Sequence, residues 1–364
     1  DEAKVREQLV RTGHVDIMVD IRGNFFYTRS VPCQLWFLNK NKPEHLKDKV
    51  LMLDARNVYR KVTRKIYDFS PEQQQNLTAI VWLYREQNER FIELVKYYID
   101  RSLLEARACE YLEEPSCQPL PDFLSQLKQL TKAFQPFLDN LEQSGTDVEH
   151  YADFLNAKEA VDGGWSAFEI ATNDLQKWWN QYDYNDAQSL LEFTEQGTCL
   201  KDLANQSRDL IKEVDLAYKL ATRVIELAEA NGAKDSELWD STLLIGRGRK
   251  NLRKAADEAR KAAVEQLKQV RYFYKQAHWL LGRFPEGQLR DVEGLVKLVD
   301  ISEIEAADWS LAPGRYVGVA PEEVDEDFDF EEALKDIHIE LKGLNSEAIE
   351  LAEKIARNFE ELGV

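Results

Sequence analysis

The chain has 364 residues, of which 44% are hydrophobic and 31% are charged, and its mean hydropathy is -0.51. This composition excludes a disordered chain and leaves room for two or three domains, while the longest apolar runs, such as residues 79–83, are too short to span a bilayer. The net charge of -19 argues against nucleic acid as a partner of the chain as a whole.

The amino-terminal part is predicted to contain a helix followed by three β-strands. Residues 3–12 have a helical pattern, and β-branched or alternating apolar runs follow at 15–21, 33–38 and 49–54. One helix beside three short strands cannot cover both faces of a sheet. The first residue is also Asp rather than Met. We therefore interpret residues 1–68 as the end of a larger α/β domain whose beginning is missing.

The loop GNFFYTRS at residues 23–30 places three consecutive aromatic side chains between two predicted strands. Exposed rings in such a loop can stack on a base that has been flipped out of a duplex, whereas buried rings can serve the core. The residue types alone favour the core. The candidates for contact with a target base or with DNA are Phe25, Phe26, Tyr27 and Arg29.

The charge of this first part is opposite to that of the rest. Residues 1–65 contain fourteen Lys and Arg against eight Asp and Glu, a net charge of +6, and the remaining residues contain 33 against 58, a net charge of -25. Any contact with phosphate groups is therefore predicted in the first part. A solvated basic face fits the same residues equally well.

From Ser70 onward the pattern is helical, with Ser70 as the predicted N-cap and Pro71 at the first helical position. We expect a helical extension at 69–115, ended by a proline-containing linker, and a helical domain at 116–300. The domain is predicted to contain an amphipathic helix at 123–141 and an antiparallel, coiled-coil-like hairpin of Ala-rich helices at 203–228 and 252–277. Between them, Trp178, Trp179, Tyr182 and Tyr184 are interpreted as a small satellite core, with a binding surface as the alternative.

The carboxy-terminal part is predicted to be a loop and acidic link at 301–328 and a helix at 329–364 with the strictest heptad pattern in the chain. Its apolar seam requires a partner helix. The fold class is therefore mainly α, with long helices, a coiled-coil-like hairpin and a carboxy-terminal heptad helix, and an amino-terminal α/β remnant. The seam consists of Phe330, Leu334, Ile337, Leu341, Leu344, Leu351 and Ile355.

Motifs for catalysis and metal binding are absent from the sequence. There is no nucleophile elbow, HExxH motif, P-loop or EF-hand loop, and the five His residues are scattered. The four Cys residues form no CxxC pair. We predict no catalytic residue and no metal site in this chain, and a reducing, cytoplasmic setting.

Two separated stretches of the sequence resemble one known family. VDIMVDI at 15–21, GNFFYTRSVPCQLWFLNKNK at 23–42 and KVLMLDAR at 49–56 resemble the last strands of the Rossmann-like methyltransferase domain in the modification subunit of type I restriction-modification systems. WSLAPGRYVGVAPEE at 309–323, followed by DEDFDFEE and the ending IARNFEELGV, is similar to the carboxy terminus of that family. The helical region between them is less familiar.

The resemblance implies an S-adenosylmethionine-dependent methyltransferase that acts on N6 of adenine in double-stranded DNA, at sites chosen by a separate specificity subunit. The family's cofactor loop and Asn-Pro-Pro-Phe/Tyr segment are missing here, and the sequence contains no Asn-Pro dipeptide. We therefore expect this chain alone to be inactive and to bind no cofactor.

The resemblance also assigns roles to two regions. Phe25, Phe26 and Tyr27 match the loop that lies near the extruded base in related adenine methyltransferases, and the heptad helix matches the tail that packs with the specificity subunit. The implied partners are the specificity subunit, DNA and, in addition, the restriction subunit, but no membrane. The alternative, from another functional class, is a free-standing helical scaffold that self-associates and has no enzymatic activity.

Overall fold

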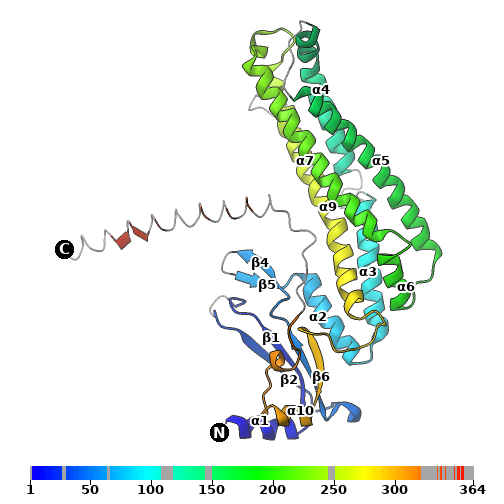
Figure 1. The fold of residues 1–364 in the computed structure, drawn as a ribbon, viewed down its shortest axis with the longest axis vertical. Helices are drawn as coiled ribbons and strands as arrows, with labels where there is room; N and C mark the ends of the chain where they lie inside the picture. The colour runs from blue at the N-terminus through cyan, green and yellow to red at the C-terminus, as the bar shows by residue number, and fades with distance from the viewer. Residues whose placement is uncertain are drawn as a thin grey trace, which may run out of the picture. The chain divides into compact units, whose positions relative to one another are not determined.

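The computed structural model describes residues 2–26, 30–63, 66–107, 118–143, 150–244 and 251–320, with isolated positions between 334 and 355. The chain divides into two units, residues 1–318 and residues 319–364. The first unit is mainly helical and has a small mixed sheet in its amino-terminal part (Figure 1).

The sheet has four strands in the order β2-β1-β3-β6. β1 (Val15–Ile21) runs parallel to β3 (Lys49–Asp54), whereas β2 (Cys33–Leu38) is antiparallel to β1 and β6 (Val296–Asp300) is antiparallel to β3. The structure therefore confirms the three predicted strands with their bounds, and it confirms the preceding helix as α1 (Glu2–Arg11).

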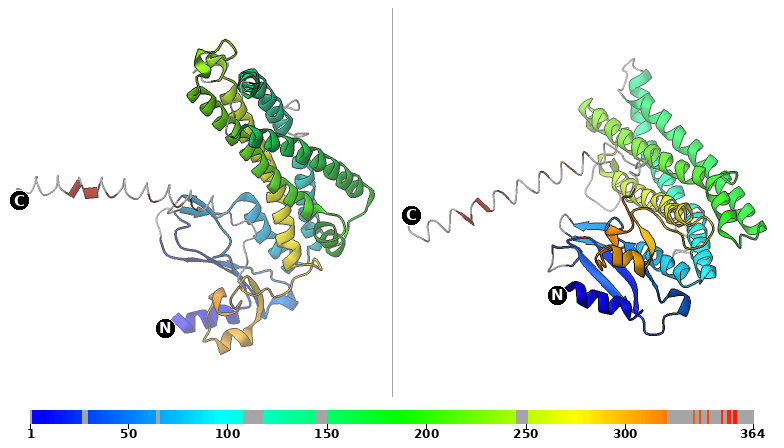
Figure 2. Two further views of the ribbon diagram at one scale, coloured as in Figure 1. Left: turned by 45° about the horizontal axis from the view of Figure 1, so that its top comes forward. Right: turned by 60° about the horizontal axis from the view of Figure 1, so that its bottom comes forward.

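Both faces of the two central strands are covered, because successive side chains point to opposite sides of the sheet. On one face, Met18 and Met52 are fully buried in a cluster with side chains of α1 and α10 (Ile301–Ala306). On the other, Ile17 and Leu51 belong to the large core that contains the buried residues of α2 (Pro71–Tyr84). Figure 2 shows the helices of the first unit on either side of the sheet.

Strand β6 and helix α10 are not among the elements predicted from the sequence, which assigns residues 296–300 to the helical domain and 301–328 to a loop. β6 covers the edge of β3 that would otherwise be open, and beyond the strand pair the Asp54 amide donates to the Leu295 carbonyl at 2.7 Å. The sheet thus obtains its fourth strand from a segment far along the chain.

A second sheet contains only two strands, β4 (Arg60–Thr63) and β5 (Ile66–Asp68), which form an antiparallel hairpin. It also is not among the predicted elements. The 3-10 helices η1 (Glu44–Leu46) and η3 (Pro313–Arg315) complete this part.

The predicted start of the helical region is confirmed at Ser70. The Ser70 hydroxyl accepts a hydrogen bond from the Gln73 amide at 3.1 Å, and the Gln73 side chain accepts one from the Ser70 amide at 2.9 Å. This capping box satisfies two amides that the first turn leaves without helical partners, and Pro71 follows at the first helical position.

Long helices make up the rest of the first unit. Helix α9 packs against α3, α4 and α7, and α5 packs against α7 (Figure 1). Pro119 opens α4, where its missing amide costs no helical hydrogen bond. The elements are α3 (Asn88–Ala106), α4 (Pro119–Gln143), α5 (Tyr151–Gln181), α6 (Ala187–Glu195), α7 (Leu200–Ala230), η2 (Ala233–Asp235), α8 (Ser241–Leu244) and α9 (Leu252–Arg283).

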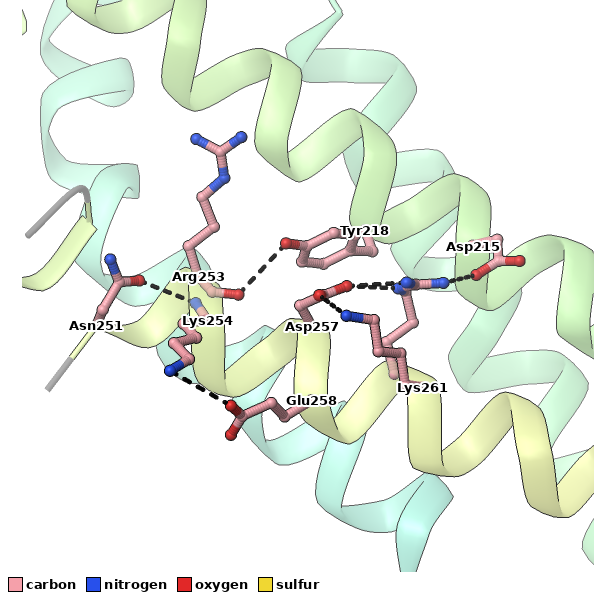
Figure 3. Close-up of polar contacts among 9 residues, drawn as sticks. Asp215, Tyr218, Asn251, Arg253, Lys254, Asp257, Glu258 and Lys261 are labelled. Carbon is pink, nitrogen blue, oxygen red and sulfur yellow. Dashed lines mark hydrogen bonds and ion pairs between the residues drawn. The ribbon is translucent and has the colours of Figure 1, made fainter. Parts of the chain in front are cut away.

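The predicted pairing of two Ala-rich helices is confirmed, because α7 and α9 run antiparallel. Arg253 near the start of α9 pairs with Glu226 near the end of α7 at 2.9 Å, and Arg271 further along α9 hydrogen-bonds Asn205 near the start of α7 at 3.0 Å. Between these contacts, Arg260 of α9 forms an ion pair with Asp215 of α7, which is labelled in Figure 3. Several small Ala side chains of the two helices, such as Ala217, Ala221 and Ala263, are fully buried.

The aromatic cluster around α5 is only partly a core. Tyr184 is buried and stacks on Trp179 at 4.9 Å. Trp178 and Tyr182 stack on each other at 5.1 Å, and about half of each side chain is exposed. The prediction of a satellite core therefore holds for one pair and fails for the other.

The second unit is described only at scattered helical positions. Leu334, Ile337, Leu341, Leu351 and Ile355 are helical there, and their exposed fractions range from 47% to 60%. Phe330 and Leu344 of the predicted seam lie outside the described residues.

Candidate nucleic-acid interface

The loop at residues 22–30 connects β1 to β2 and crosses itself closely. A Cβ atom on Gly23 would lie 2.4 Å from the Ser30 carbonyl oxygen, so this crossing requires glycine. Asn24 follows in the left-handed region at φ 61°, a conformation that Asn tolerates better than most residues. The local sequence thus sets the start of the aromatic loop.

The two described aromatic residues of this loop have different environments. The Phe25 ring lies 4.5 Å from the Phe69 ring and 5.7 Å from the Phe26 ring, measured between centroids, and it packs against the main core. Phe26 is 44% exposed. Phe25 therefore has a structural role, whereas Phe26 is available for a contact. Tyr27 and Arg29 lie outside the described residues.

The β4–β5 hairpin packs against the base of this loop. The Arg22 guanidinium carbon lies 3.8 Å from the Tyr59 ring centroid and 3.9 Å from that of Tyr67, which places a cation over two aromatic faces. The Tyr67 amide donates to the Asn24 carbonyl at 3.2 Å, and the Gln73 side chain donates to the Tyr59 carbonyl at 2.9 Å. These contacts join the hairpin and the aromatic loop into one surface.

The hairpin is exposed and basic. Arg60 and Asp68, which face each other across its base, form two hydrogen bonds of 2.9 and 2.7 Å; these bonds raise the pKa of Arg60 and lower that of Asp68. Lys61 is exposed and makes no ion pair with any residue that the structure describes, and Val62 is 49% exposed. Sequence reasoning counted Lys61 among the basic residues but missed the hairpin, because exposed strands lack the apolar alternation that marks a strand.

Residues 309–317 return to the same sheet. Trp309 lies against α1, where the Arg6 side chain donates to its carbonyl at 3.0 Å. The Gly314 amide donates to Asp20 at the end of β1 at 3.3 Å, and a Cβ on Gly314 would lie 2.4 Å from the guanidinium of Arg56. Residues 309–317 thus pack on the amino-terminal strands, although nearly 300 residues separate them in sequence.

Strand β2 is the opposite edge of the sheet, and no strand among the described residues pairs with its outer side. Leu35, Trp36, Phe37 and Leu38 are between 38% and 56% exposed, although their side chains point alternately to both faces. A groove of about 680 Å³ runs beside it, lined by Trp36, α1 and residues 308–315. An apolar edge strand of this kind invites pairing with another strand.

The described residues offer little for a metal or a cofactor. They contain no group of three or more His, Cys, Asp or Glu side chains placed to hold a metal ion. Of the glycines before α2, Gly13 ends α1 and Gly23 makes the close crossing with Ser30, so neither forms a loop between a strand and a following helix. Neither of these two glycines therefore matches the glycine-containing cofactor loop of the family that the sequence resembles. Within the same described ranges, no helix is long and apolar enough to cross a membrane.

Comparison with known proteins assigns the region that carries this interface. Residues 1–101 match the sequence model of the N-6 DNA Methylase family. The chain is 34% identical over 64 residues to the type I restriction enzyme MjaIX methylase subunit of Methanocaldococcus jannaschii, and 32% identical over 72 residues to the type I restriction enzyme HindI methylase subunit of Haemophilus influenzae.

These alignments cover 18% and 20% of this chain but only 12% and 16% of the two relatives, so the chain spans a small part of the curated proteins it matches. No solved structure gives a significant match. The comparisons confirm the resemblance to the modification subunits of type I restriction-modification systems, and residues 1–101 are similar to the N-6 DNA methylase family.

Proposed function

We propose that this chain is part of the modification subunit of a type I restriction-modification system and acts in the cytoplasm. The complete subunit transfers a methyl group from S-adenosylmethionine to N6 of adenine in double-stranded DNA. The share of this chain is to complete the methyltransferase sheet, to contact DNA and to dock onto the specificity subunit, with the restriction subunit as a further partner of the assembly.

The uncovered edge of β2 carries this proposal. Its neighbours β1 and β3 are almost entirely buried, yet the apolar side chains of β2 are exposed on both faces. A strand of this composition is stable in water when another strand pairs with it and helices cover it. We infer that β2 receives the remaining strands of a Rossmann-like methyltransferase domain, and that the groove beside Trp36 accommodates part of that domain.

S-adenosylmethionine supplies the methyl group when it is bound to the complete subunit. We expect its site to be formed by other residues of that subunit, and we assign no step of methyl transfer to the residues described here. Phe26 is the described residue best placed to contact an extruded base, because it is exposed while Phe25 anchors the loop. Tyr27 and Arg29 remain candidates for base or DNA contact that are proposed from the sequence alone.

The heptad helix is the proposed docking element for the specificity subunit. Its described seam positions are helical and about half exposed, which is the state of an apolar stripe before a partner covers it. Burial of such a stripe in a groove between partner helices would form a coiled-coil contact. The alternative scaffold function would use the same stripe for self-association.

Two measurements test this proposal. The complete subunit, assembled with its specificity subunit, is expected to transfer label from tritiated S-adenosylmethionine to DNA, recovered as N6-methyladenine. Replacing both Trp36 and Phe37 by Glu is expected to abolish the transfer, whereas Leu216→Glu on α7, which is 49% exposed, is the matched control and should leave it unchanged. No labelled adenine from the unaltered assembly would refute the methyltransferase role.

Docking is tested separately by co-purification. Leu341→Asp together with Leu344→Asp is expected to remove the specificity subunit from the purified complex, because charged groups would occupy the centre of the apolar seam. Leu216→Asp again serves as the control. Unchanged co-purification would refute the docking role, and a stable homodimer of the chain without any DNA binding at low salt would favour the scaffold.

A further inference from the structure

The β4–β5 hairpin is an exposed, basic element beside the aromatic loop. It is a two-stranded ribbon separate from the main sheet, and every residue of β4 is exposed. The dimensions of a two-stranded ribbon allow it to enter the major groove of DNA or to lie along the backbone. The loop that carries Phe26 lies at its base.

The charge of the hairpin is complementary to a phosphate backbone. From residue 56 to residue 68 the sequence contains five Lys and Arg and one acidic residue, Asp68, in a chain whose net charge is -19. Asp68 is neutralised by its two hydrogen bonds with Arg60. Lys61 is therefore presented on the ribbon without a nearby carboxylate partner among the described residues.

The hairpin is also held in a fixed position, which reduces the ordering cost of a contact. The Arg22 guanidinium lies over the rings of Tyr59, just before β4, and Tyr67 in β5, which are neighbours at the base of the hairpin and meet edge to face with centroids 5.2 Å apart. The Nε atom of Arg22 is buried and has no hydrogen-bond partner among the described residues, so this side chain is fixed mainly by ring contacts. An ordinary solvated basic loop would not require such an anchor.

We propose that the β4–β5 hairpin contacts the sugar-phosphate backbone of the DNA substrate, with Lys61 as a phosphate ligand, and so holds the duplex beside the loop that carries Phe26. This inference rests on the proposed function and names the element that provides DNA contact. The competing occupant is a partner protein chain, which would use the exposed Val62 rather than the charge of Lys61.

The test is the salt dependence of DNA binding by the subunit assembled with its specificity subunit, measured by fluorescence anisotropy with a labelled duplex. The logarithm of the binding constant falls linearly as the logarithm of the salt concentration rises. Lys61→Ala is expected to make this slope shallower by about 0.9, the value for one lost phosphate contact. Val62→Glu, which adds a negative charge to the same strand, is expected to weaken binding on the order of tenfold at low salt.

Matched controls lie on α7. Lys212→Ala removes an exposed lysine, and Leu216→Glu adds a carboxylate at a side chain that is 49% exposed, as is Val62. Both controls should leave the slope and the affinity unchanged. An unchanged melting temperature and unchanged co-purification of the specificity subunit show that the hairpin variants are folded and assembled.

The outcomes separate the two proposals. If the unaltered assembly binds DNA with a salt-dependent affinity but the hairpin variants behave like the α7 controls, the hairpin contact is overturned and the DNA role stands. Loss of the specificity subunit from the Lys61 or Val62 variants would also overturn it in favour of a protein contact. If the unaltered assembly shows no salt-dependent DNA binding, both the hairpin contact and the proposed DNA role are overturned.

Discussion

The amino-terminal sheet and the helical bundle differ in how completely each buries its apolar side chains. In the bundle, the large apolar side chains at the helix contacts, such as Phe134 and Phe154, are fully buried, and the polar contacts between α7 and α9 join partners within the chain. The sheet leaves β2, Phe26 and the β4–β5 hairpin exposed. Among the described residues, the open strand edge and the exposed hairpin therefore lie on the sheet side, whereas the bundle exposes the stacked pair of Trp178 and Tyr182.

The two regions also differ in where their charged side chains lie. The ion pairs along the outside of the bundle, such as Lys254 with Glu258, are exposed on both sides. The sheet buries Asp16, which is 2% exposed and accepts hydrogen bonds from Tyr84 and Arg85 at the end of α2. In the bundle, the buried carboxylate is Glu105 of α3, which is 8% exposed and pairs with Arg101 of the same helix at 2.8 Å.

The largest effect is expected from removing a ring in the bundle core. Phe134→Ala leaves a cavity beside Phe154, whose ring centroid lies 5.5 Å away, and should lower the free energy of unfolding by about 3–5 kcal/mol. Phe37→Ala on β2, where the side chain is 49% exposed, should change it by less than about 0.5 kcal/mol. Urea unfolding of the two variants measures both values. Equal losses would contradict the conclusion that the ring in the bundle is buried and the ring on β2 is exposed.

The buried carboxylate of the sheet gives the next effect. Arg85→Met leaves Asp16 with Tyr84 and Asn39 as its remaining side-chain partners and should cost about 2–3 kcal/mol, because an uncompensated buried charge is left behind. Lys254→Met removes an exposed pair and should cost less than about 0.5 kcal/mol. A loss for Arg85→Met as small as that of the control would show that Asp16 is solvated.

Two neighbouring rings sharpen the comparison within the aromatic loop. Phe25→Ala should cost about 1–2 kcal/mol of stability because it removes the contact with Phe69, whereas Phe26→Ala should cost less than about 0.5 kcal/mol. In the assembled subunit Phe26→Ala should nevertheless slow methylation about tenfold, the effect of a lost base-stacking contact. The reverse assignment of stability and activity to the two rings would contradict their placement.

Local patterns predicted the elements whose burial follows a regular period. The three strands at 15–21, 33–38 and 49–54, the N-cap at Ser70 and the antiparallel pair of α7 and α9 all carry such a period or a capping signal. β6 has only five residues, and its role is decided by pairing with β3, which is distant in the sequence. β4 is exposed throughout, so no apolar alternation marks it.

The candidate site was predictable only as a group of residues. Three consecutive aromatics between strands indicated a special loop, but the ring that becomes buried is decided by Phe69, which lies on the far side of the β4–β5 hairpin in sequence. Likewise, the sequence does not indicate that residues 309–317 touch the amino-terminal strands. The hydrogen bond from Gly314 to Asp20 brings them together.

The smallest expected effect is a pH dependence that originates in the sheet. Burial lowers the pKa of Lys42 to about 8, because desolvation outweighs the attraction of Asp16. Its ammonium group donates to the carbonyls of Val15 and Lys49, and Arg85 and Asp48 are the other charged neighbours. Above pH 8 the folded protein releases this proton, whereas the unfolded chain holds it until about pH 10.4. Stability therefore rises with pH in this window, since the unfolded state binds more protons.

Lys42→Met removes this dependence. Between pH 7 and about pH 8.7 the unaltered chain should gain about 1 kcal/mol of unfolding free energy relative to the variant, as measured by urea unfolding at both pH values. The range stops below pH 10 because burial raises the pKa of Tyr84, whose ionisation in the unfolded state would reverse the trend. The matched substitution Lys212→Met, at an exposed lysine on α7, should leave the pH dependence of the unaltered chain in place. Parallel curves for the unaltered chain and the Lys42 variant would show that Lys42 keeps its charge in the folded sheet, so that the sheet tolerates buried charge as easily as the surface of the bundle carries it.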